Sequence, residues 1–211
     1  MKILTLLGSP RKKGNTSTVL SWVEEALAAE GHQIERVNLV SKDINGCLAC
    51  KKCKENDKEP GCIQKDDGNE ILEKMVSAEG VIYASPLFYW GFSAQMKALV
   101  DRRYCLFRGS CGAKDHRSFV EGQRHGLIMT AADPFENNFE EVMKAFQRML
   151  VYDKAHSAGE LFVCNCKTPD ALGEEVKALA YSYANQFCRP AFEPYALLIP
   201  GGAHHFIPAG K

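Results

Sequence analysis

The sequence predicts an α/β fold in which a doubly wound parallel sheet carries helices on both faces. Strand-length apolar runs alternate with helical patterns of apolar residues as far as residue 187, which is typical of strands joined by crossover helices. The first run, residues 3–7, is continuously apolar, as expected for a strand covered on both faces. The second run, residues 33–40, mixes apolar and polar residues, which indicates a sheet edge.

Each element follows from a local pattern. Apolar residues cluster between turn residues in five expected strands, at 3–7, 33–40, 81–85, 125–130 and 159–163. Apolar residues recur at helical spacing in five expected helices, around 19–27 and 71–76 and over 95–104, 139–150 and 168–187. Gly31 ends the first helix, and Pro169 lies at the start of the last one.

With the second strand at an edge, the five strands fit the flavodoxin-like order 2-1-3-4-5. The ligand site of that fold lies beyond the carboxyl ends of strands one and three. A chain of 211 residues suits one domain. We expect this domain over residues 1–190, with a cysteine-rich loop at 45–66, a long linker without periodicity at 105–124, and a C-terminal tail at 191–211.

The charge balance excludes several partners. Lys and Arg total 26, and Asp and Glu total 26, so no excess charge favours nucleic acid or an anionic membrane surface. No apolar run approaches the roughly 20 residues that span a bilayer, and the N-terminus lacks the pattern of a signal peptide. We therefore expect a cytoplasmic protein with no membrane and no nucleic-acid partner.

The loop after the first strand has the composition of a phosphate-binding loop. Small and hydroxyl residues let backbone N–H groups approach an anion, and the following helix adds its positive N-terminal end. The Walker and dinucleotide patterns are excluded, because no Lys follows Gly14 and a third glycine is missing. A terminal phosphomonoester fits best, and an ordinary capped helix is the alternative. The candidate contacts are Ser9, Arg11, Gly14, Asn15, Thr16 and Ser17.

Three consecutive aromatic residues follow the third strand, at Phe88, Tyr89 and Trp90. They come after Ser-Pro at the mouth of the predicted sheet, where a planar, partly apolar ring system would use them. Packing of Phe88 and Trp90 on the next helix is the alternative explanation.

These two motifs together resemble the NADPH-dependent FMN reductase family of flavodoxin-fold flavoproteins. The resemblance rests on Gly-Ser-Pro-Arg…Gly-Asn-Thr after the first strand, and on Ser-Pro-Leu-Phe-Tyr-Trp-Gly with Ser-Ala-Gln-Met-Lys-Ala-Leu-Val-Asp-Arg after the third. It covers about residues 1–165 and implies that the first loop holds the phosphate of FMN. Thr130 and Ala131 would make a third flavin contact, although Ala131 and Ala132 replace glycines often found there. The isoalloxazine and ribityl groups would be lined by Pro86, Leu87, Phe88, Tyr89 and Trp90.

Four of the nine cysteines lie close together, at Cys47, Cys50, Cys53 and Cys62. Successive two-residue gaps suit three corners of a [4Fe-4S] cluster, with a fourth ligand arriving from nearby. Zinc sites more often use two separated Cys-x-x-Cys pairs, so zinc is the lesser alternative. Reduced thiols in a surface loop are the other alternative. The remaining five cysteines are expected to be buried, reduced thiols.

The cysteine loop also resembles that of the iron–sulfur flavoproteins, a branch of the same group, although its last gap is longer than usual. The resemblances imply an FMN-dependent NAD(P)H oxidoreductase that passes electrons through bound flavin to a small acceptor such as a quinone or free flavin. NAD(P)H or a ferredoxin-like protein would be the donor, and a homodimer or homotetramer would complete the flavin site. Because flavin itself carries the electrons, no catalytic side chain is required. An iron–sulfur electron carrier between proteins and a thiol redox sensor are the alternatives.

Overall fold

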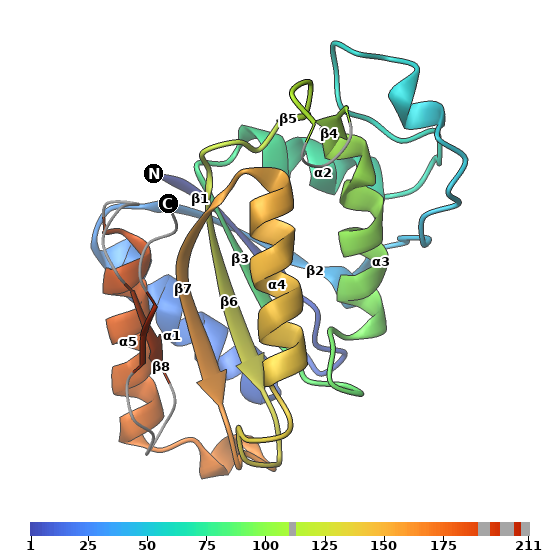
Figure 1. The fold of residues 1–211 in the computed structure, drawn as a ribbon. Coiled ribbons are helices and arrows are strands. Elements are labelled where there is room, and N and C mark those ends of the chain that lie inside the picture. The colour runs from blue at the N-terminus through green and yellow to red at the C-terminus, as the bar shows by residue number, and fades with distance from the viewer. Residues whose placement is uncertain (110–112, 190–194, 199–204, 208–211) are drawn as a thin grey trace.

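A parallel sheet with helices on both faces forms the centre of the computed structural model, which describes residues 1–109, 113–189, 195–198 and 205–207 (Figure 1). Five parallel strands correspond to those expected: β1 (Lys2–Leu7), β2 (Gln33–Asn38), β3 (Gly80–Pro86), β6 (Arg124–Thr130) and β7 (His156–Val163). They pair in the order β2-β1-β3-β6-β7. The predicted flavodoxin-like order is therefore confirmed.

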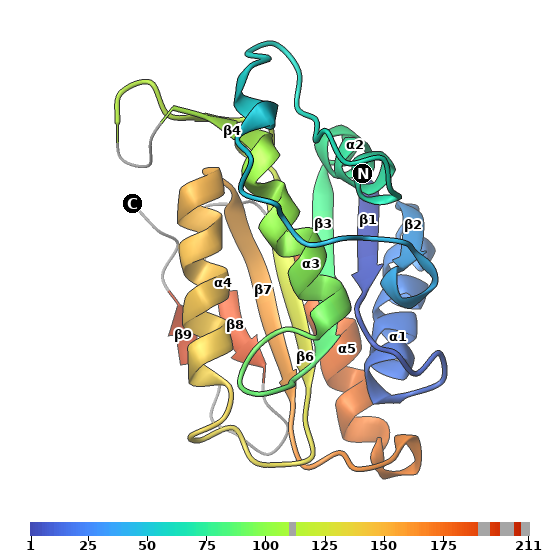
Figure 2. The same ribbon diagram turned by 90° about the vertical axis from the view of Figure 1, so that its right-hand side faces the viewer.

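The two faces of the sheet carry separate sets of helices (Figure 2). Helices α1 (Asn15–Ala29) and α5 (Glu174–Phe187) cover one face. Helices α2 (Gly68–Ser77), α3 (Ala94–Arg102) and α4 (Glu140–Asp153) cover the other.

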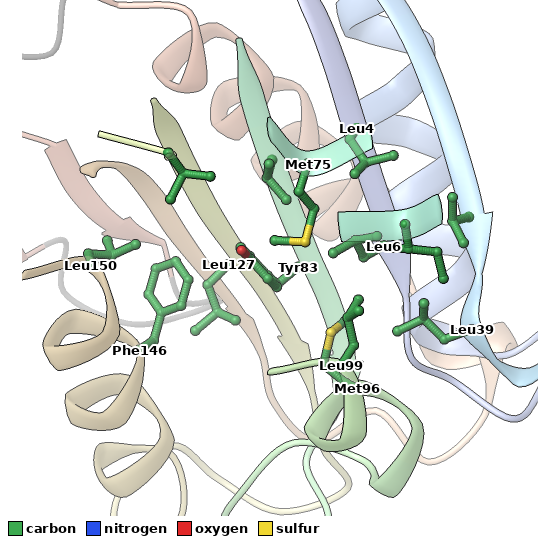
Figure 3. Packing of buried hydrophobic residues seen from close by; sticks show 14 of the residues in the cluster. Leu4, Leu6, Leu39, Met75, Tyr83, Met96, Leu99, Leu127, Phe146 and Leu150 are labelled. Carbon is green, nitrogen blue, oxygen red and sulfur yellow. The ribbon is translucent and has the colours of Figure 1, made fainter. Parts of the chain in front are cut away.

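Alternation of side chains along each strand fills both cores, because successive residues point to opposite faces. Figure 3 shows the core beneath α2, α3 and α4, where apolar residues of the strands meet those of the helices: Leu4, Leu6, Tyr83, Leu127, Met75, Met96, Leu99 and Phe146. On β1, Ile3 and Leu7 belong instead to the core beneath α1 and α5.

The sheet extends into the segment expected to be a tail. Strand β8 (Tyr195–Leu198) pairs in parallel with β7, and β9 (His205–Ile207) pairs antiparallel with β8. Strands of three and four residues take their conformation from long-range pairing and packing. The local pattern of a segment rich in proline and glycine therefore did not reveal them.

The linker at 105–124 also contains regular structure. A 3-10 helix, η3 (Arg103–Leu106), leads into β4 (Phe107–Arg108), which pairs antiparallel with β5 (Arg117–Ser118). The last helix begins later than predicted, at Glu174, because residues 169–171 form a separate 3-10 turn and Gly173 caps the helix. Among the described residues, no helix combines the length and apolar character needed to cross a membrane.

Candidate functional site

The residues predicted to bind ligands gather in two places, at opposite ends of helix α3. A cleft lies beyond the carboxyl ends of β1, β3 and β6, next to the N-terminal end of α3. The cysteine loop lies at the C-terminal end of α3, on the far side of the molecule from the arrowheads of the strands (Figure 1). The nine residues of α3 span about 14 Å, so the two sites are distinct.

The cleft has a volume of about 500 Å³. It is lined by every residue predicted to contact flavin except Ser17, which is buried in helix α1 outside the lining. The structure adds residues that the sequence interpretation did not select: Pro10, Lys13, Ala132, Asp133, Asn138, Cys166, Lys167 and Pro169. Three of these follow β7, whose carboxyl end lies at the same edge of the sheet as those of β1, β3 and β6. The sequence could have indicated these residues, because the loops that follow parallel strands meet at the same edge of the sheet.

The first loop leaves the N-terminus of α1 open. Gly14 is the N-cap residue, no side chain caps the helix, and its first turn holds no acidic residue. The loop is folded on itself, because the Arg11 amide donates to Ser9 Oγ at 3.2 Å and the Gly14 amide donates to the Arg11 carbonyl at 3.2 Å. Unpaired N–H groups and the helix dipole make such an end attractive to an anion. Arg11 and Lys13 add positive side chains to the lining.

Gly8 fixes the first loop against the third. Its amide donates to the Ala84 carbonyl at 2.8 Å, and its carbonyl accepts from Ser93 Oγ at 2.7 Å. Ser93 also caps helix α3 by accepting from the Met96 amide. A Cβ on residue 8 would lie 2.8 Å from Ser93 Oγ and 2.9 Å from Met96 Cβ, so only glycine fits this approach without displacement.

Hydrogen bonds join three of the loops that line the cleft. Thr16 Oγ1 and Thr130 Oγ1 lie 2.8 Å apart, and Asn15 Nδ2 donates to the Cys166 carbonyl at 2.6 Å. Asn15 Oδ1 is buried and has no hydrogen-bond partner among the described residues. An unpartnered buried acceptor on a residue that lines a cleft fits a donor supplied by a ligand.

The aromatic turn is strained and exposed. Phe88 and Gly91 exchange two backbone hydrogen bonds of 3.1 Å, and between them Tyr89 (φ 47°) and Trp90 (φ 58°) are in the left-handed conformation. The exposed fractions of Phe88, Tyr89 and Trp90 are 48%, 95% and 53%. Packing on the next helix therefore does not explain these aromatics. Left-handed bulky residues are costly and cluster at functional sites.

The second site brings together all four cysteines of the predicted set. Cys47, Cys50, Cys53 and Cys62 line a small cavity with Cys105, which the sequence interpretation did not include. Cys105 is buried where α3 ends, and burial raises the pKa of its thiol to about 11. Among the described residues no cysteine forms a disulfide, and of the four described cysteines outside the predicted set only Cys105 and Cys166 are buried, whereas Cys164 and Cys188 are half-buried. Cys111 lies outside the described residues.

The spacing of these sulfur atoms is wider than a single ion requires. Zn–S bonds of about 2.3 Å in a tetrahedron place sulfur atoms about 3.8 Å apart. Within the described ranges, no three of the five cysteines have their sulfur atoms within 4.8 Å of one another. In this arrangement no three of these sulfur atoms are close enough to bind one zinc ion together.

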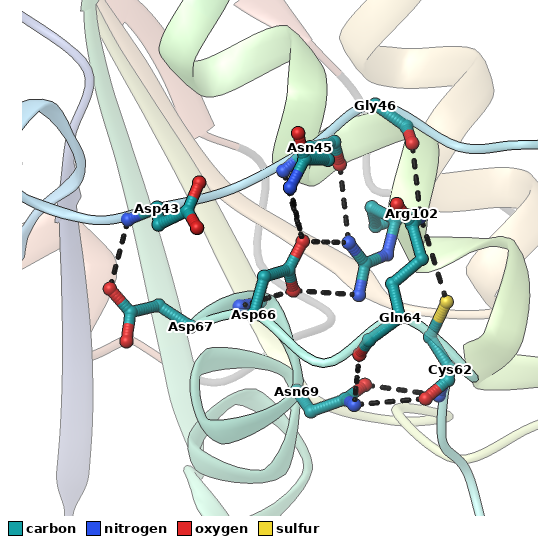
Figure 4. Close-up of polar contacts among 10 residues, drawn as sticks. Asp43, Asn45, Gly46, Cys62, Gln64, Asp66, Asp67, Asn69 and Arg102 are labelled. Atoms are coloured by element: carbon teal, nitrogen blue, oxygen red, sulfur yellow. Dashed lines mark hydrogen bonds and ion pairs between the residues drawn. The ribbon is translucent and has the colours of Figure 1, made fainter.

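An ion pair clamps the base of the cysteine loop (Figure 4). Arg102 Nη1 and Nη2 donate to the two carboxylate oxygens of Asp66 at 2.6 and 3.0 Å, and both side chains are almost fully buried. Arg102 also donates to the Asn45 carbonyl, while the amides of Asn45 and Gly68 donate to Asp66. Burial raises the pKa of the Asp66 carboxyl, but these hydrogen bonds outweigh it and lower the pKa to about 2.

Further hydrogen bonds connect the segment that enters the loop with the segment that leaves it. The Asp43 amide donates to Asp67, and Gln64 Nε2 donates to the Gly46 carbonyl. Asn69 accepts from the Cys62 amide and donates to the Cys62 carbonyl (Figure 4). The base of the loop is thus held by polar contacts.

The linker holds the outer part of the loop. Arg108, which is buried, donates to the carbonyls of Asn56 and Glu59. Lys54 Nζ donates to the Phe107 carbonyl at 2.6 Å and lies 3.5 Å from the centre of the Phe107 ring. Burial lowers the pKa of Lys54 to about 8. Two basic side chains, Lys54 and Arg102, therefore lie beside the thiols.

Comparison with known proteins gives matches in sequence and in fold. The family model for NADPH-dependent FMN reductase matches residues 1–134. An iron–sulfur flavoprotein of Methanocaldococcus jannaschii is 43% identical over 102 residues, which cover 48% of this chain and 51% of the relative. The match thus spans about half the length of that relative. An iron–sulfur flavoprotein of Methanosarcina thermophila is 30% identical over 162 residues, which cover 75% of this chain and 81% of the relative.

The fold is similar to that of solved oxidoreductases. An NAD(P)H:quinone oxidoreductase from Methanothermobacter marburgensis superposes with a TM-score of 0.66 over 88% of this chain and 96% of that one, at 15% identity.

Proposed function

We propose that this chain, which belongs to the NADPH-dependent FMN reductase family, is an oxidoreductase that binds FMN in the cleft and an iron–sulfur cluster in the cysteine loop. The observation that carries the proposal is the meeting, in one cleft, of an uncapped helix N-terminus with a strained, exposed aromatic turn. One end of the cleft suits a phosphate and the other suits a planar ring, and FMN has both.

The residues of the cleft fit FMN in chemistry as well as in size. The phosphate would lie at the N–H groups of the first turn of α1, near Arg11 and Lys13. Asn15 Oδ1 would accept a hydrogen bond from a hydroxyl of the ligand. The ring would lie against residues 86–90 and 130–131. When bound, FMN supplies the hydride and electron chemistry, and the chain binds and orients it.

The open side of the ring-binding region would admit a second molecule. Tyr89 and Trp90 leave about half or more of their surfaces exposed beside the cleft, and flat aromatic surfaces of this kind suit a nicotinamide or a quinone. We propose NAD(P)H as the reductant and a small molecule such as a quinone or free flavin as the acceptor. The family and the solved oxidoreductases of similar fold support this reaction class.

Cys47, Cys50, Cys53 and Cys62 would hold a [4Fe-4S] cluster. Their position around one small cavity, the nearby cations Lys54 and Arg102, and the iron–sulfur flavoproteins among the relatives support this assignment. Within one chain, electrons passing between this site and the cleft would cross the length of α3. A protein that relays electrons between proteins through both centres is the second candidate, because two redox groups in one chain would permit such a relay.

The phosphate end of the cleft is tested by comparing FMN with riboflavin, which lacks the phosphate. We expect the wild-type chain to bind FMN at micromolar concentration or tighter, and riboflavin at least about tenfold more weakly, because a charged hydrogen bond contributes about 1.5–3 kcal/mol. Arg11→Gln should weaken FMN binding about tenfold and leave riboflavin binding unchanged. Lys12→Gln is the matched control, because Lys12 is adjacent but does not line the cleft. Failure to bind FMN would refute the proposal.

The cysteine loop is tested by assaying iron and acid-labile sulfide in protein purified without oxygen. About four of each per chain are expected, and Cys50→Ser should lower both. Cys164→Ser is the control, because Cys164 is half-buried and lines neither site. Bound zinc, or no metal, would contradict the cluster. Rapid oxidation of NADPH with a quinone present would favour the reductase, and reduction only by a ferredoxin-like protein would favour the carrier.

A further inference from the structure

Three potential metal ligands meet outside both sites, where helices α1 and α5 end. Glu30 is the C-cap residue of α1, His32 lies in the turn between α1 and β2, and Cys188 is the C-cap residue of α5. His32 Nε2 is 3.1 Å from Cys188 Sγ and 3.8 Å from Glu30 Oε2. All three ligand atoms lie within 4.8 Å of one another, and in the part of the chain that the structure describes this is the one such group.

We propose that Glu30, His32 and Cys188 form a binding site for a divalent transition-metal ion, with zinc as the best-fitting ion. A thiolate, an imidazole and a carboxylate are the three ligand types that zinc takes from proteins. Harder ions such as Mg²⁺ and Ca²⁺ prefer oxygen ligands alone. The mixed set therefore selects a borderline-soft ion.

The distances agree with one ion at the centre of the group. Zinc bonds of about 2.0–2.3 Å in a tetrahedron place neighbouring ligand atoms about 3.4–3.6 Å apart. The distances from His32 Nε2 to Cys188 Sγ and to Glu30 Oε2, 3.1 and 3.8 Å, lie on either side of that range, so adjustments of a few tenths of an ångström would complete the site. The side chain of Glu30 is 42% exposed, which leaves the fourth position open to water.

The charged groups near Cys188 are the carboxylate of Glu30, the guanidinium of Arg124 and the N-terminal amine. A bound divalent ion would replace the thiol proton and would separate the two negative ligands. On the other side of the His32 ring, Nδ1 lies 3.2 Å from the nitrogen of Met1. Metal binding through Nε2 places the ring proton on Nδ1, so the Met1 amine would have to accept that hydrogen bond.

The site would connect two helices that build one core of the molecule. Helices α1 and α5 pack on the same face of the sheet, and the ion would join the C-terminal end of each. The opposite end of α1 is the candidate phosphate site. The ion would thus stabilise the folded chain without entering the flavin cleft or the cysteine loop, and the inference does not depend on the proposed function.

Cobalt(II) is the probe, because a bound thiolate gives it a charge-transfer absorption in the near ultraviolet. The full-length chain carrying Cys→Ser substitutions at residues 47, 50, 53 and 62 removes the other cluster of thiols. We expect this protein to bind one cobalt ion per chain with that absorption. Cys188→Ser should abolish the absorption, and Glu30→Gln should raise the Kd for cobalt at least tenfold. Glu25→Gln, an exposed glutamate on the same helix, should leave the Kd unchanged.

Absorption that persists in Cys188→Ser, or equal effects of Glu30→Gln and Glu25→Gln, would overturn the proposal. If the protein with the four Cys→Ser substitutions does not fold, the same question can be answered with the natural cysteine loop, by measuring the zinc bound per chain after dialysis against zinc. His32→Ala should then bind one zinc ion per chain fewer than the wild type, and equal stoichiometry would refute the site. His32→Ala with the natural loop should keep the FMN and iron contents of the wild type, which separates this result from the outcome for the proposed function.

Discussion

The cleft and the cysteine loop are constructed in different ways. The cleft is formed by the ends of parallel strands, and its loops are joined by buried bonds such as that between Thr16 and Thr130. The cysteine loop is an excursion with one short 3-10 helix (Lys52–Lys54), and polar contacts around Arg102 and Asp66 secure its base. The first site is part of the core, whereas the second is attached to it.

This difference separates two kinds of binding site. A cleft built from the core has its shape before the ligand arrives, so its residues are preorganised. The cysteine loop is held by polar contacts at its base and by Arg108 farther out, and a metal site of this kind gains further order from its ligand. Both sites nevertheless contain left-handed residues other than glycine, such as Tyr89 in the cleft and Lys51 in the loop. We therefore expect substitutions at the clamp to have the larger effects on the loop, and substitutions at Gly8 to affect the cleft.

The largest effect is expected from Arg102→Met. This change leaves the buried carboxylate of Asp66 without its partner, and breaking a buried pair in this way costs about 3–5 kcal/mol. Urea denaturation should show that loss in the free energy of unfolding, and limited proteolysis should cut the cysteine loop more readily. Lys97→Ala removes an exposed pair with Asp101 on the same helix and should cost less than about 0.5 kcal/mol. Similar losses in the two variants would show that the buried pair of Arg102 and Asp66 contributes no more stability than an exposed pair.

Gly8→Ala is expected to have the next largest effect, and this effect should fall on the cleft. The added Cβ would come within 3 Å of Ser93 Oγ and Met96 Cβ, and such overpacking costs about 1–3 kcal/mol. Because the first and third loops would move apart, FMN affinity should fall by at least about tenfold while iron content stays constant. Gly46→Ala, with no atom within 4 Å of the new Cβ, is the control. A loss of iron in Gly8→Ala would show that the two sites are coupled.

The ion pair between Arg102 and Asp66 also predicts that the free energy of unfolding falls at acid pH. The carboxyl of Asp66 has a pKa of about 2 in the folded chain against a usual 3.8, so the folded state binds its proton less tightly than the unfolded state. The resulting stability, about 2 kcal/mol, is fully present above about pH 4 and is lost as the pH falls toward 2. The free energy of unfolding should therefore fall more steeply in this range for the wild type than for Asp66→Asn. Parallel pH profiles would contradict the ion pair.

The sequence was sufficient for the features that local patterns encode. Five strands and their order follow from apolar runs, and the first loop and the aromatic turn supplied predicted flavin contacts that, except for Ser17, line one cleft. Lys167 and Cys166 were missed because they enter the cleft only through the position of β7 in the sheet. Arg102 resembles an ordinary residue near a helix end, and its role comes from a contact with Asp66, 36 residues away in the chain. Strands β8 and β9 were missed for the same reason, since pairing defines them.

The smallest effect on stability is expected from Tyr89→Gly. This variant tests whether the strained backbone at Tyr89 serves ligand binding. The Tyr89 side chain is 95% exposed, so its removal loses little packing, and its left-handed backbone costs roughly 1–2 kcal/mol in a residue with a Cβ. Glycine relieves that strain but gains freedom in the unfolded chain. The free energy of unfolding should therefore rise by only about 0.5 kcal/mol, as measured by urea denaturation.

FMN affinity should fall severalfold in the same variant, because an aromatic face beside the ring is lost. Lys154→Gly is the matched comparison, since Lys154 is also left-handed, at the C-cap of α4, and does not line the cleft. It should gain stability to a similar extent with FMN affinity unchanged. If Tyr89→Gly instead lost stability while Lys154→Gly gained it, contacts of the tyrosine ring would be holding the turn. The strained backbone would then result from packing of the tyrosine ring and would not serve ligand binding.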